Sequence, residues 1–219
     1  MEYDRIVFLC NMMSVCNMTF LTLGFSAIIS THLVTGGFMG GLYPNDYIDS
    51  VYDVNFKKLY EEGYRLLLFD VDNTLVPHGA PADKRAIQLF QELREIGFRT
   101  WFLSNNKEPR VKSFCEAVNG TSYIFKCGKP DTEAYLDAVK RSGCQKSQAF
   151  FFGDQIFTDI WGANKSGIRN CMVKPVLKWK EEPQIVLKRL LEAIILVFYK
   201  IHTSGNRHIN LVPLKSNRK

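Results

Sequence analysis

Short apolar segments alternate with helical patterns between residues 64 and 173, and no other feature of this 219-residue chain constrains its fold as strongly. Arg65–Asp70, Arg99–Ser104 and Ala149–Gly153 are apolar almost throughout, which is typical of parallel strands covered on both faces. Shorter candidate strands are Tyr123–Phe125 and Cys171–Val173. The alternation predicts an α/β fold, a three-layer sandwich around a parallel sheet.

Helical patterns fill the gaps between these segments. In Asp83–Ile96, apolar residues recur on one face, and Gly97 then ends the pattern. Further helices are expected at Pro109–Val118, Asp131–Ser142 and Asp159–Ser166.

Polar side chains gather where the expected strands end. Asp70 and Asp72 follow the first strand (D-V-D-N-T-L), and Ser104 ends the second (F-L-S-N-N). Lys129 follows the third strand (G-K-P), and Asp154 follows the fourth (G-D-Q-I-F-T-D). Ligands of open parallel sheets bind beyond the carboxyl ends of the strands. A preference for strand-end turns explains any one of these residues, but four strands that deliver charge or hydroxyl to one edge indicate a reaction site.

These residue types suit the hydrolysis of a phosphate ester. A carboxylate such as Asp70 can attack phosphorus and split one difficult step into two. A second acid, Asp72, can protonate the leaving oxygen and later activate water. Ser104 and Lys129 can hold the phosphoryl oxygens, and Asp154 can help to bind a magnesium ion.

Taken together, D-V-D-N-T-L, F-L-S-N-N, G-K-P and G-D-Q-x-x-T-D resemble the four motifs of the haloacid dehalogenase (HAD) superfamily. The chain looks most like the YqeG-type HAD-IIIA phosphatases, which are related to phosphatidylglycerophosphate phosphatases. The resemblance begins near Tyr43, includes W-G-A-N-K-S-G, and runs to about Pro175. It implies a HAD-like Rossmannoid fold and a phosphoaspartate at Asp70.

The resemblance also implies roles for the other motif residues. Asp72 is the acid/base and Lys129 belongs to the catalytic set. The phosphate is expected to lie against Thr74, Ser104, Asn105 and Lys129. Magnesium is expected on Asp70, Asp154 and the backbone carbonyl of Asp72, while the role of Asp159 is left open.

The spacing of the motifs bears on the substrate. Only 33 residues separate Asp70 from Ser104 and 24 separate Ser104 from Lys129, and each interval already holds a helix and a strand. HAD enzymes insert a substrate-covering cap domain in one of these intervals, so the resemblance implies a capless, open site. Such a site suits a phosphate on a lipid headgroup, with phosphatidylglycerophosphate as the first candidate. A phosphatase of small sugar or nucleotide phosphates and a non-enzymatic binding module are the alternatives.

The expected organisation has four parts. Residues 1–38 form an apolar segment, either a membrane anchor or a non-native extension ahead of a later start at Met39. Residues 39–180 form the phosphatase domain. Residues 181–203 form an amphipathic helix with Ile194 and Val197 on its apolar stripe, which either packs on its own domain or lies on a membrane surface. Residues 204–219 form a basic tail.

The distribution of charge and the cysteine pattern indicate which partners and which compartment to expect. Residues 1–173 hold 18 basic and 19 acidic side chains (−1), whereas residues 174–219 hold 10 and 3 (+7). Such a terminus is either a solvated face or a contact for an anionic membrane or nucleic acid; given the motifs, no nucleic-acid partner is expected. None of the six cysteines forms a C-x-x-C pair, which predicts reduced thiols in a cytoplasmic protein, either free or membrane-associated.

Overall fold

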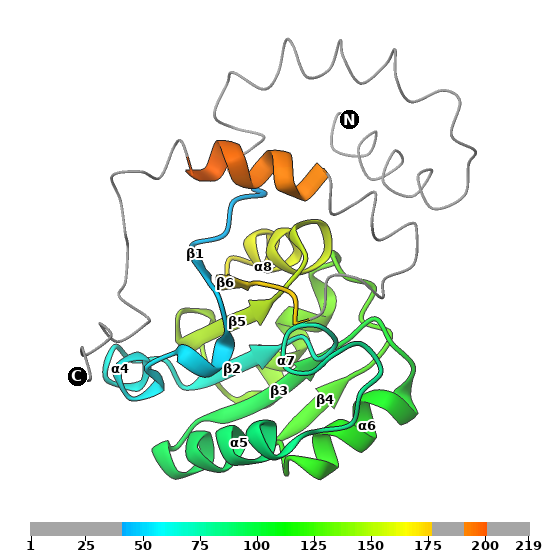
Figure 1. Ribbon diagram of the computed structural model, residues 1–219. Coiled ribbons are helices and arrows are strands. Elements are labelled where there is room, and N and C mark those ends of the chain that lie inside the picture. Colours follow the sequence, from blue (N-terminus) through cyan, green and yellow to red (C-terminus); the bar gives the residue numbers. More distant parts are fainter. Residues whose placement is uncertain (1–40, 177–190, 201–219) are drawn as a thin grey trace, which may run out of the picture.

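The computed structural model describes residues 41–176 and 191–200. Six parallel strands form one sheet in the order β1-β6-β5-β2-β3-β4 (Figure 1). They are β1 (Asp46–Ile48), β2 (Leu66–Phe69), β3 (Arg99–Leu103), β4 (Ser122–Ile124), β5 (Ala149–Gly153) and β6 (Arg169–Val173). The predicted α/β fold with a parallel sheet is confirmed.

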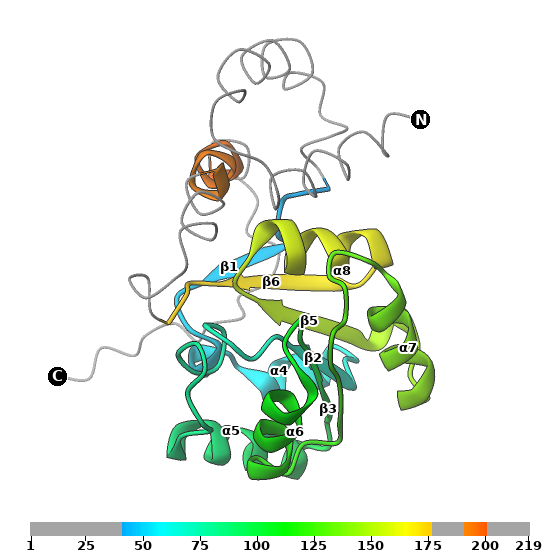
Figure 2. The same ribbon diagram turned by 90° about the vertical axis from the view of Figure 1, so that its right-hand side faces the viewer.

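Alternate side chains of the strands enter two apolar layers. On β2, Leu67 and Phe69 join one layer while Leu66 and Leu68 join the other, and all four are fully buried. The helices α4 (Phe56–Glu61), α5 (Lys84–Ile96) and α6 (Glu108–Ala117) complete the first layer, and α7 (Glu133–Ser142) and α8 (Trp161–Ser166) complete the second. Helices therefore cover both faces of the sheet, as the views in Figures 1 and 2 show.

The chain order places a reversal at β2. From β2 the chain continues outward through β3 to β4, and it then returns to β5 on the other side of β2. Such a reversal leaves a crevice beyond the carboxyl ends of the central strands, which is where ligands of open α/β sheets bind. Asp70 follows the last residue of β2 and therefore lies at this crevice.

Aromatic packing fixes the end of β2. Phe69, directly before Asp70, stacks on Phe152 of β5 with ring centroids 5.2 Å apart, and Phe90 of α5 meets it edge-on at 5.2 Å. Aromatic pairs of this kind contribute about 0.5–1.5 kcal/mol each beyond the area they bury. The backbone that carries Asp70 is thus anchored in the apolar layer that contains α5.

The expected elements agree with the observed ones to within two residues at most ends, with two differences. Sequence periodicity did not predict β1, the 3-10 turn η1 (Val51–Asp53) or α4, which are all short. The helix expected at Asp159–Ser166 is longer: it opens with a π-helical turn, η3 (Ile156–Ile160), and continues as α8.

No cap domain interrupts the described chain between the predicted motifs. The connection from β2 to β3 contains α5, and the connection from β3 to β4 contains α6. Between β4 and β5 lie α7 and the 3-10 turn η2 (Lys146–Gln148). The capless arrangement expected from the spacing is therefore what the structure shows.

Residues 191–200 form a helix that packs on the domain through a face that matches the predicted apolar stripe only in part, since Phe198 of that stripe packs against the domain. Ile195 is buried against Leu42, Ile160 and Trp161, whereas the predicted stripe residues Ile194 and Val197 are about half exposed, at 52% and 56%. In the described part of the chain, no helix has the length and apolarity needed to cross a bilayer. The apolar segment 1–38, residues 181–190 and 201–203 of the predicted helix, and the basic tail 204–219 lie outside the described residues.

The N-cap of α5 offers a stability test away from the crevice. Asp83 Oδ1 accepts a hydrogen bond from the Ala86 amide at 2.7 Å. We expect Asp83→Ala to lower the free energy of unfolding by about 1 kcal/mol, because a first-turn amide loses its acceptor. Asp83→Asn keeps the acceptor and removes the charge, so it should retain most of the stability. Urea denaturation of both variants makes the comparison; equal losses would show that charge, not capping, stabilises this end.

Candidate active site

A buried ammonium group joins three segments of the chain. Lys129 Nζ lies 2.6 Å from Asp70 Oδ1 and 2.6 Å from Asp159 Oδ1. Asp70 follows β2, Lys129 lies between β4 and α7, and Asp159 belongs to η3. The side chains of Lys129 and Asp159 are each 2% exposed and that of Asp70 is 12% exposed. The predicted residues Asp70 and Lys129 therefore meet, and Asp159 joins them.

Burial and charge act in opposite directions on these groups. Burial raises the pKa of Asp70, and the repulsion from Asp159 adds to it, so that the pKa reaches about 7 despite the attraction of Lys129. Burial alone lowers the pKa of Lys129, but the two carboxylates outweigh it and hold this pKa well above its usual value. Lys129 is therefore a fixed positive charge beside Asp70.

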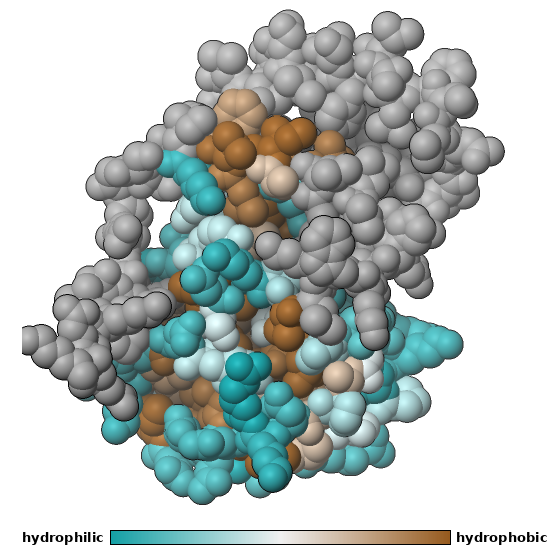
Figure 3. Space-filling model, in the orientation of Figure 1, coloured by the Kyte–Doolittle hydropathy of each residue, from teal (hydrophilic) through white to brown (hydrophobic). Residues whose placement is uncertain are grey.

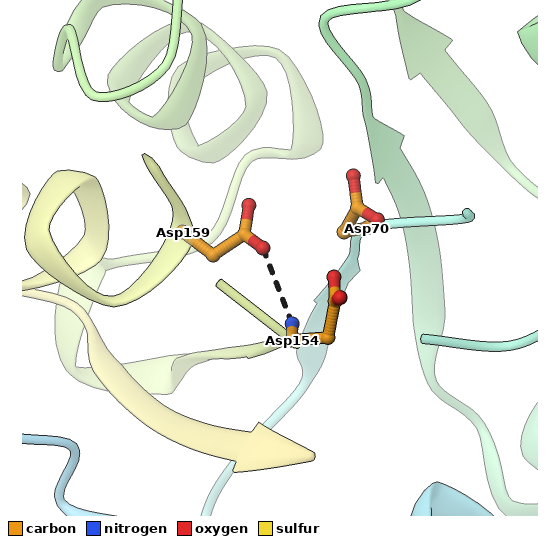
Figure 4. A group of neighbouring side chains, drawn as sticks. All are labelled: Asp70, Asp154 and Asp159. Atoms are coloured by element: carbon orange, nitrogen blue, oxygen red, sulfur yellow. Dashed lines mark hydrogen bonds between the residues drawn. The ribbon is translucent and has the colours of Figure 1, made fainter. Parts of the chain in front are cut away.

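Three carboxylates converge on one point beside this ammonium group. Asp70, Asp154 and Asp159 each place an oxygen within 4.8 Å of the others' (Figure 4). Asp159 Oδ2 accepts hydrogen bonds from the amides of Asp154 (3.2 Å) and Gln155 (3.1 Å), while its Oδ1 meets Lys129. Donors thus occupy both oxygens of Asp159, which leaves Asp70 and Asp154 as the members best able to accept a cation.

The donor set fits a hard divalent cation such as magnesium. Oxygens of buried carboxylates are the ligands that magnesium and calcium prefer, and Asp154 is fully buried at the end of β5. Thr74, also buried, donates from Oγ1 to Asp154 Oδ1 at 3.3 Å and so orients this carboxylate. Thr74 was predicted to contact the phosphate, and that contact stays a prediction; in the structure its hydroxyl hydrogen-bonds to Asp154.

Asp72 makes a separate set of contacts, and its carboxylate is not a member of the three-carboxylate cluster. Its oxygens accept hydrogen bonds from the Gly79 amide (2.8 Å), Asn106 Nδ2 (3.2 Å) and Arg110 Nη2 (3.0 Å). Burial by itself raises the pKa of Asp72, but the Gly79 amide and the Arg110 guanidinium outweigh it and hold this pKa below its ordinary value. The side chain is therefore held as a carboxylate that Arg110 and Asn106 orient.

Ser104 and Asn105 lie at the end of β3, beside Lys129. Ser104 is 3% exposed, and its Oγ accepts a hydrogen bond from the Asn106 amide at 3.1 Å, which leaves the hydroxyl proton free to rotate. Asn105 forms a reciprocal pair with the backbone of Lys129: Oδ1 accepts from the Lys129 amide at 2.8 Å, and Nδ2 donates to the Lys129 carbonyl at 3.2 Å. Asn105 was predicted to bind substrate, which stays a prediction; in the structure its side-chain amide pairs with the backbone of Lys129.

Sequence reasoning did not single out four residues that contact this site. Asn106 and Arg110 hold Asp72, Tyr135 donates its hydroxyl to the Asp159 carbonyl at 3.1 Å, and Glu192 accepts from the Ile156 amide. Asn106 and Arg110 follow Ser104 in S-N-N-K-E-P-R. They lie between the strand end at Ser104 and the first turn of the expected helix, and this position near the sheet edge could have identified them. Tyr135 and Glu192 lie 24 and 36 residues from their partners, and no local pattern relates them.

Comparison with known proteins identifies the class. The haloacid dehalogenase-like hydrolase family matches residues 80–167. The probable phosphatase YqeG of Bacillus subtilis (strain 168) is 35% identical over 134 residues, which cover 61% of this chain and 77% of that protein. The chain belongs to the haloacid dehalogenase-like hydrolases. It is a phosphatase of this family.

The chain also has more distant similarities to another phosphatase and to a solved structure. The chloroplastic phosphatidylglycerophosphate phosphatase 1 of Chlamydomonas reinhardtii is 26% identical over 148 residues, which cover 64% of this chain and 55% of that protein. The match therefore spans little more than half of the algal enzyme. Among solved structures, the cobalt-bound deoxy-D-mannose-octulosonate 8-phosphate phosphatase of Haemophilus influenzae is 14% identical, covers 68% of this chain and 96% of its own, and has a TM-score of 0.42.

Removing the buried ammonium group should destabilise the fold. In Lys129→Met, Asp70 and Asp159 stay buried without their counter-charge, and breaking a buried pair in this way costs about 3–5 kcal/mol. We expect that loss in urea denaturation. Adding Asp159→Asn to Lys129→Met should recover part of it, because one uncompensated charge disappears while an amide oxygen still accepts from residues 154 and 155. Full stability of Lys129→Met alone would contradict this account.

Proposed function

We propose that this phosphatase hydrolyses phosphate monoesters with magnesium through a phosphoaspartate at Asp70. The observation that carries the proposal is the contact of Lys129 with Asp70 beside Asp154, at the crevice where β2 and β5 end. A carboxylate beside a fixed positive charge and a cation site is suited to attack phosphorus, since both charges offset its repulsion from the phosphate.

Asp70, Asp154 and the backbone carbonyl of Asp72 would hold the magnesium ion, with Thr74 orienting Asp154. When bound, the ion supplies positive charge that neutralises the phosphoryl oxygens. Asp159 acts differently in this proposal: it holds Lys129 with one oxygen and the backbone before η3 with the other.

The first chemical step forms the phosphoaspartate. An oxygen of Asp70 attacks phosphorus, a new P–O bond forms to Asp70, and the bond from phosphorus to the substrate oxygen breaks with its electron pair leaving on that oxygen. Asp72, in its protonated form, gives its proton to the leaving oxygen. Because Arg110 and Asn106 favour the ionised carboxylate, this donation requires Asp72 to exchange those contacts for the leaving oxygen.

The second step regenerates Asp70. Asp72, now a carboxylate, takes a proton from water as the water oxygen attacks phosphorus, and the bond from phosphorus to Asp70 breaks to release inorganic phosphate. Throughout, Lys129 and the Ser104 hydroxyl hold the phosphoryl oxygens. Asn105 fixes the backbone of Lys129 by two hydrogen bonds and so helps to position the ammonium group beside Asp70.

For the substrate, we propose a phosphate on a lipid headgroup, with phosphatidylglycerophosphate first. The absence of a cap domain in the described chain leaves room for a large substrate. The helix at residues 191–200 exposes Ile194 and Val197 next to Lys200, and apolar residues gather over it in Figure 3. An apolar face with flanking cations favours contact with an anionic membrane surface. Similarity to the algal phosphatidylglycerophosphate phosphatase supports the same substrate class.

Replacement of the nucleophile is the first test. We expect Asp70→Asn to lower kcat at least about 10³-fold, because an amide oxygen does not form the phosphoaspartate. Asp137→Asn, on the exposed face of α7, removes the same charge away from the crevice and should leave turnover unchanged. Acid-quenched wild-type enzyme should carry acid-stable counts from ³²P-labelled substrate at Asp70, and the variant none. Near-normal turnover by folded Asp70→Asn would remove Asp70 from its role.

The second test separates substrate classes and the cation requirement in one assay. Phosphate release is measured from phosphatidylglycerophosphate in mixed micelles and from soluble sugar and nucleotide phosphates, each with magnesium and with excess chelator. We expect kcat/KM to be highest for the lipid, activity to stop with chelator, and magnesium to restore it better than calcium, which takes more ligands at longer distances. A preference for soluble esters would contradict the lipid assignment, and undiminished turnover in chelator would contradict the cation.

A further inference from the structure

Glu192 is a buried carboxylate that the catalytic motifs do not include. It lies on the helix at residues 191–200, outside the segment 80–167 that matches the hydrolase family, and it is 3% exposed. Its Oε1 accepts a hydrogen bond from the backbone amide of Ile156 at 2.6 Å. A glutamate is almost never this buried without such a partner, so the contact fixes both the helix and the backbone it reaches.

The amide that Glu192 binds is part of the active-site backbone. Ile156 lies between Asp154 and Asp159 and is the first residue of η3. The amides of Asp154 and Gln155 point to Asp159 Oδ2, and the next amide, that of Ile156, points to Glu192. Two carboxylates therefore bind three successive amides, and the first amides of a helix have no acceptor within the helix itself.

Apolar packing holds the helix in register over this turn. Ile195, three residues after Glu192, is 8% exposed and lies in one cluster with Ile156, Ile160 and Trp161, the last two at the end of η3 and the start of α8. The helix thus contacts the π-helical turn in two ways. The Glu192 side chain binds a backbone amide of the turn, and apolar side chains of the helix pack against apolar side chains of the turn. A shift of the helix would move the backbone that carries Asp154 and Asp159.

We infer that Glu192 is a positioning residue for the phosphatase site, which keeps residues 154–156 in the conformation that presents Asp154 to the cation and Asp159 to Lys129. The inference rests on the role proposed for Asp154. Groups that orient a metal ligand typically change metal affinity or activity by about 10–100-fold when they are removed. The effect of Glu192 is expected on cation binding and kcat, because its hydrogen bond reaches the backbone of Ile156, between Asp154 and Asp159.

The test compares three substitutions of Glu192 with a control on the same helix. Glu192→Met removes the acceptor at similar length, Glu192→Asp keeps the charge but withdraws it by one methylene, and Glu192→Gln keeps an acceptor without the charge. Ile195→Val loosens the packing of the helix and leaves the hydrogen bond in place. Each protein is measured as the full chain, with circular dichroism to establish that it is folded.

Two readouts are used. In metal-free protein, hydrogen exchange at the Ile156 amide should accelerate at least about 10-fold in Glu192→Met and Glu192→Asp, but not in Glu192→Gln or Ile195→Val. In turnover, the magnesium concentration for half-maximal rate should rise about 10–100-fold in Glu192→Met and Glu192→Asp with kcat lowered, while KM for the phosphate ester changes less than about twofold. Glu192→Gln should retain values close to those of the wild type.

The outcomes separate this inference from the proposed function. Unchanged exchange at Ile156 in Glu192→Met overturns the inference whatever the enzyme hydrolyses. Accelerated exchange with an unchanged magnesium requirement also overturns it, since the contact would then be structural alone. If Asp70→Asn retains turnover, the reaction proposed for the site fails, and the exchange measurement still decides whether Glu192 holds the turn. If Glu192→Met does not fold, Glu192→Asp gives the same decision.

Discussion

The ammonium group of Lys129 is the interaction on which the arrangement of this site depends. It is buried, and it lies 2.6 Å from carboxylates of two segments that are 89 residues apart in the chain, Asp70 and Asp159. An isolated charge in such a place would be strongly unfavourable, and so would either carboxylate. The segments that carry Asp70, Lys129 and Asp159 can therefore reach their buried positions only together. Asn105 on the Lys129 backbone and Tyr135 on the Asp159 carbonyl extend the same dependence into β3 and α7.

Much of this fold could be predicted because its signals are local. Buried parallel strands such as Leu66–Phe69 are apolar on both faces, and their carboxyl ends meet at one edge, so sequence alone was enough to place Asp70, Ser104 and Asp154 together. The hydrogen-bond partners of Thr74 and Asn105 could not be predicted in this way. Each carries a polar group that suits a phosphate equally well, and only the three-dimensional neighbours, Asp154 and the Lys129 backbone, show where it points.

The helix at residues 191–200 shows a second limit. Its sequence from Ala193 to Phe198 is apolar at every position, so a helical period alone does not choose the buried face. The predicted stripe included Ile194, Val197 and Phe198; in the structure Phe198 packs on the domain, but Ile194 and Val197 are exposed, while Glu192 and Ile195 are buried. In this orientation Glu192 accepts a hydrogen bond from the Ile156 amide, 36 residues away in sequence. The π-helical turn η3 could not be predicted for a similar reason: the amides at its start, those of Gln155 and Ile156, donate to Asp159 and Glu192.

The position of β1 has a consequence for how the protein is made. β1 is the first strand of the described chain to leave the ribosome, yet it pairs with β6, the last: Asp46 lies opposite Cys171, and Asn45 and Asn170 exchange hydrogen bonds across 125 residues. β2 can pair with β3 as soon as β3 is synthesised, but its other edge stays unpaired until β5 is synthesised. The nascent chain therefore carries an unpaired β1 and an unpaired, apolar edge of β2 until β5 and β6 are synthesised. Prematurely ended chains would keep these edges exposed, and exposed edges of this kind favour aggregation.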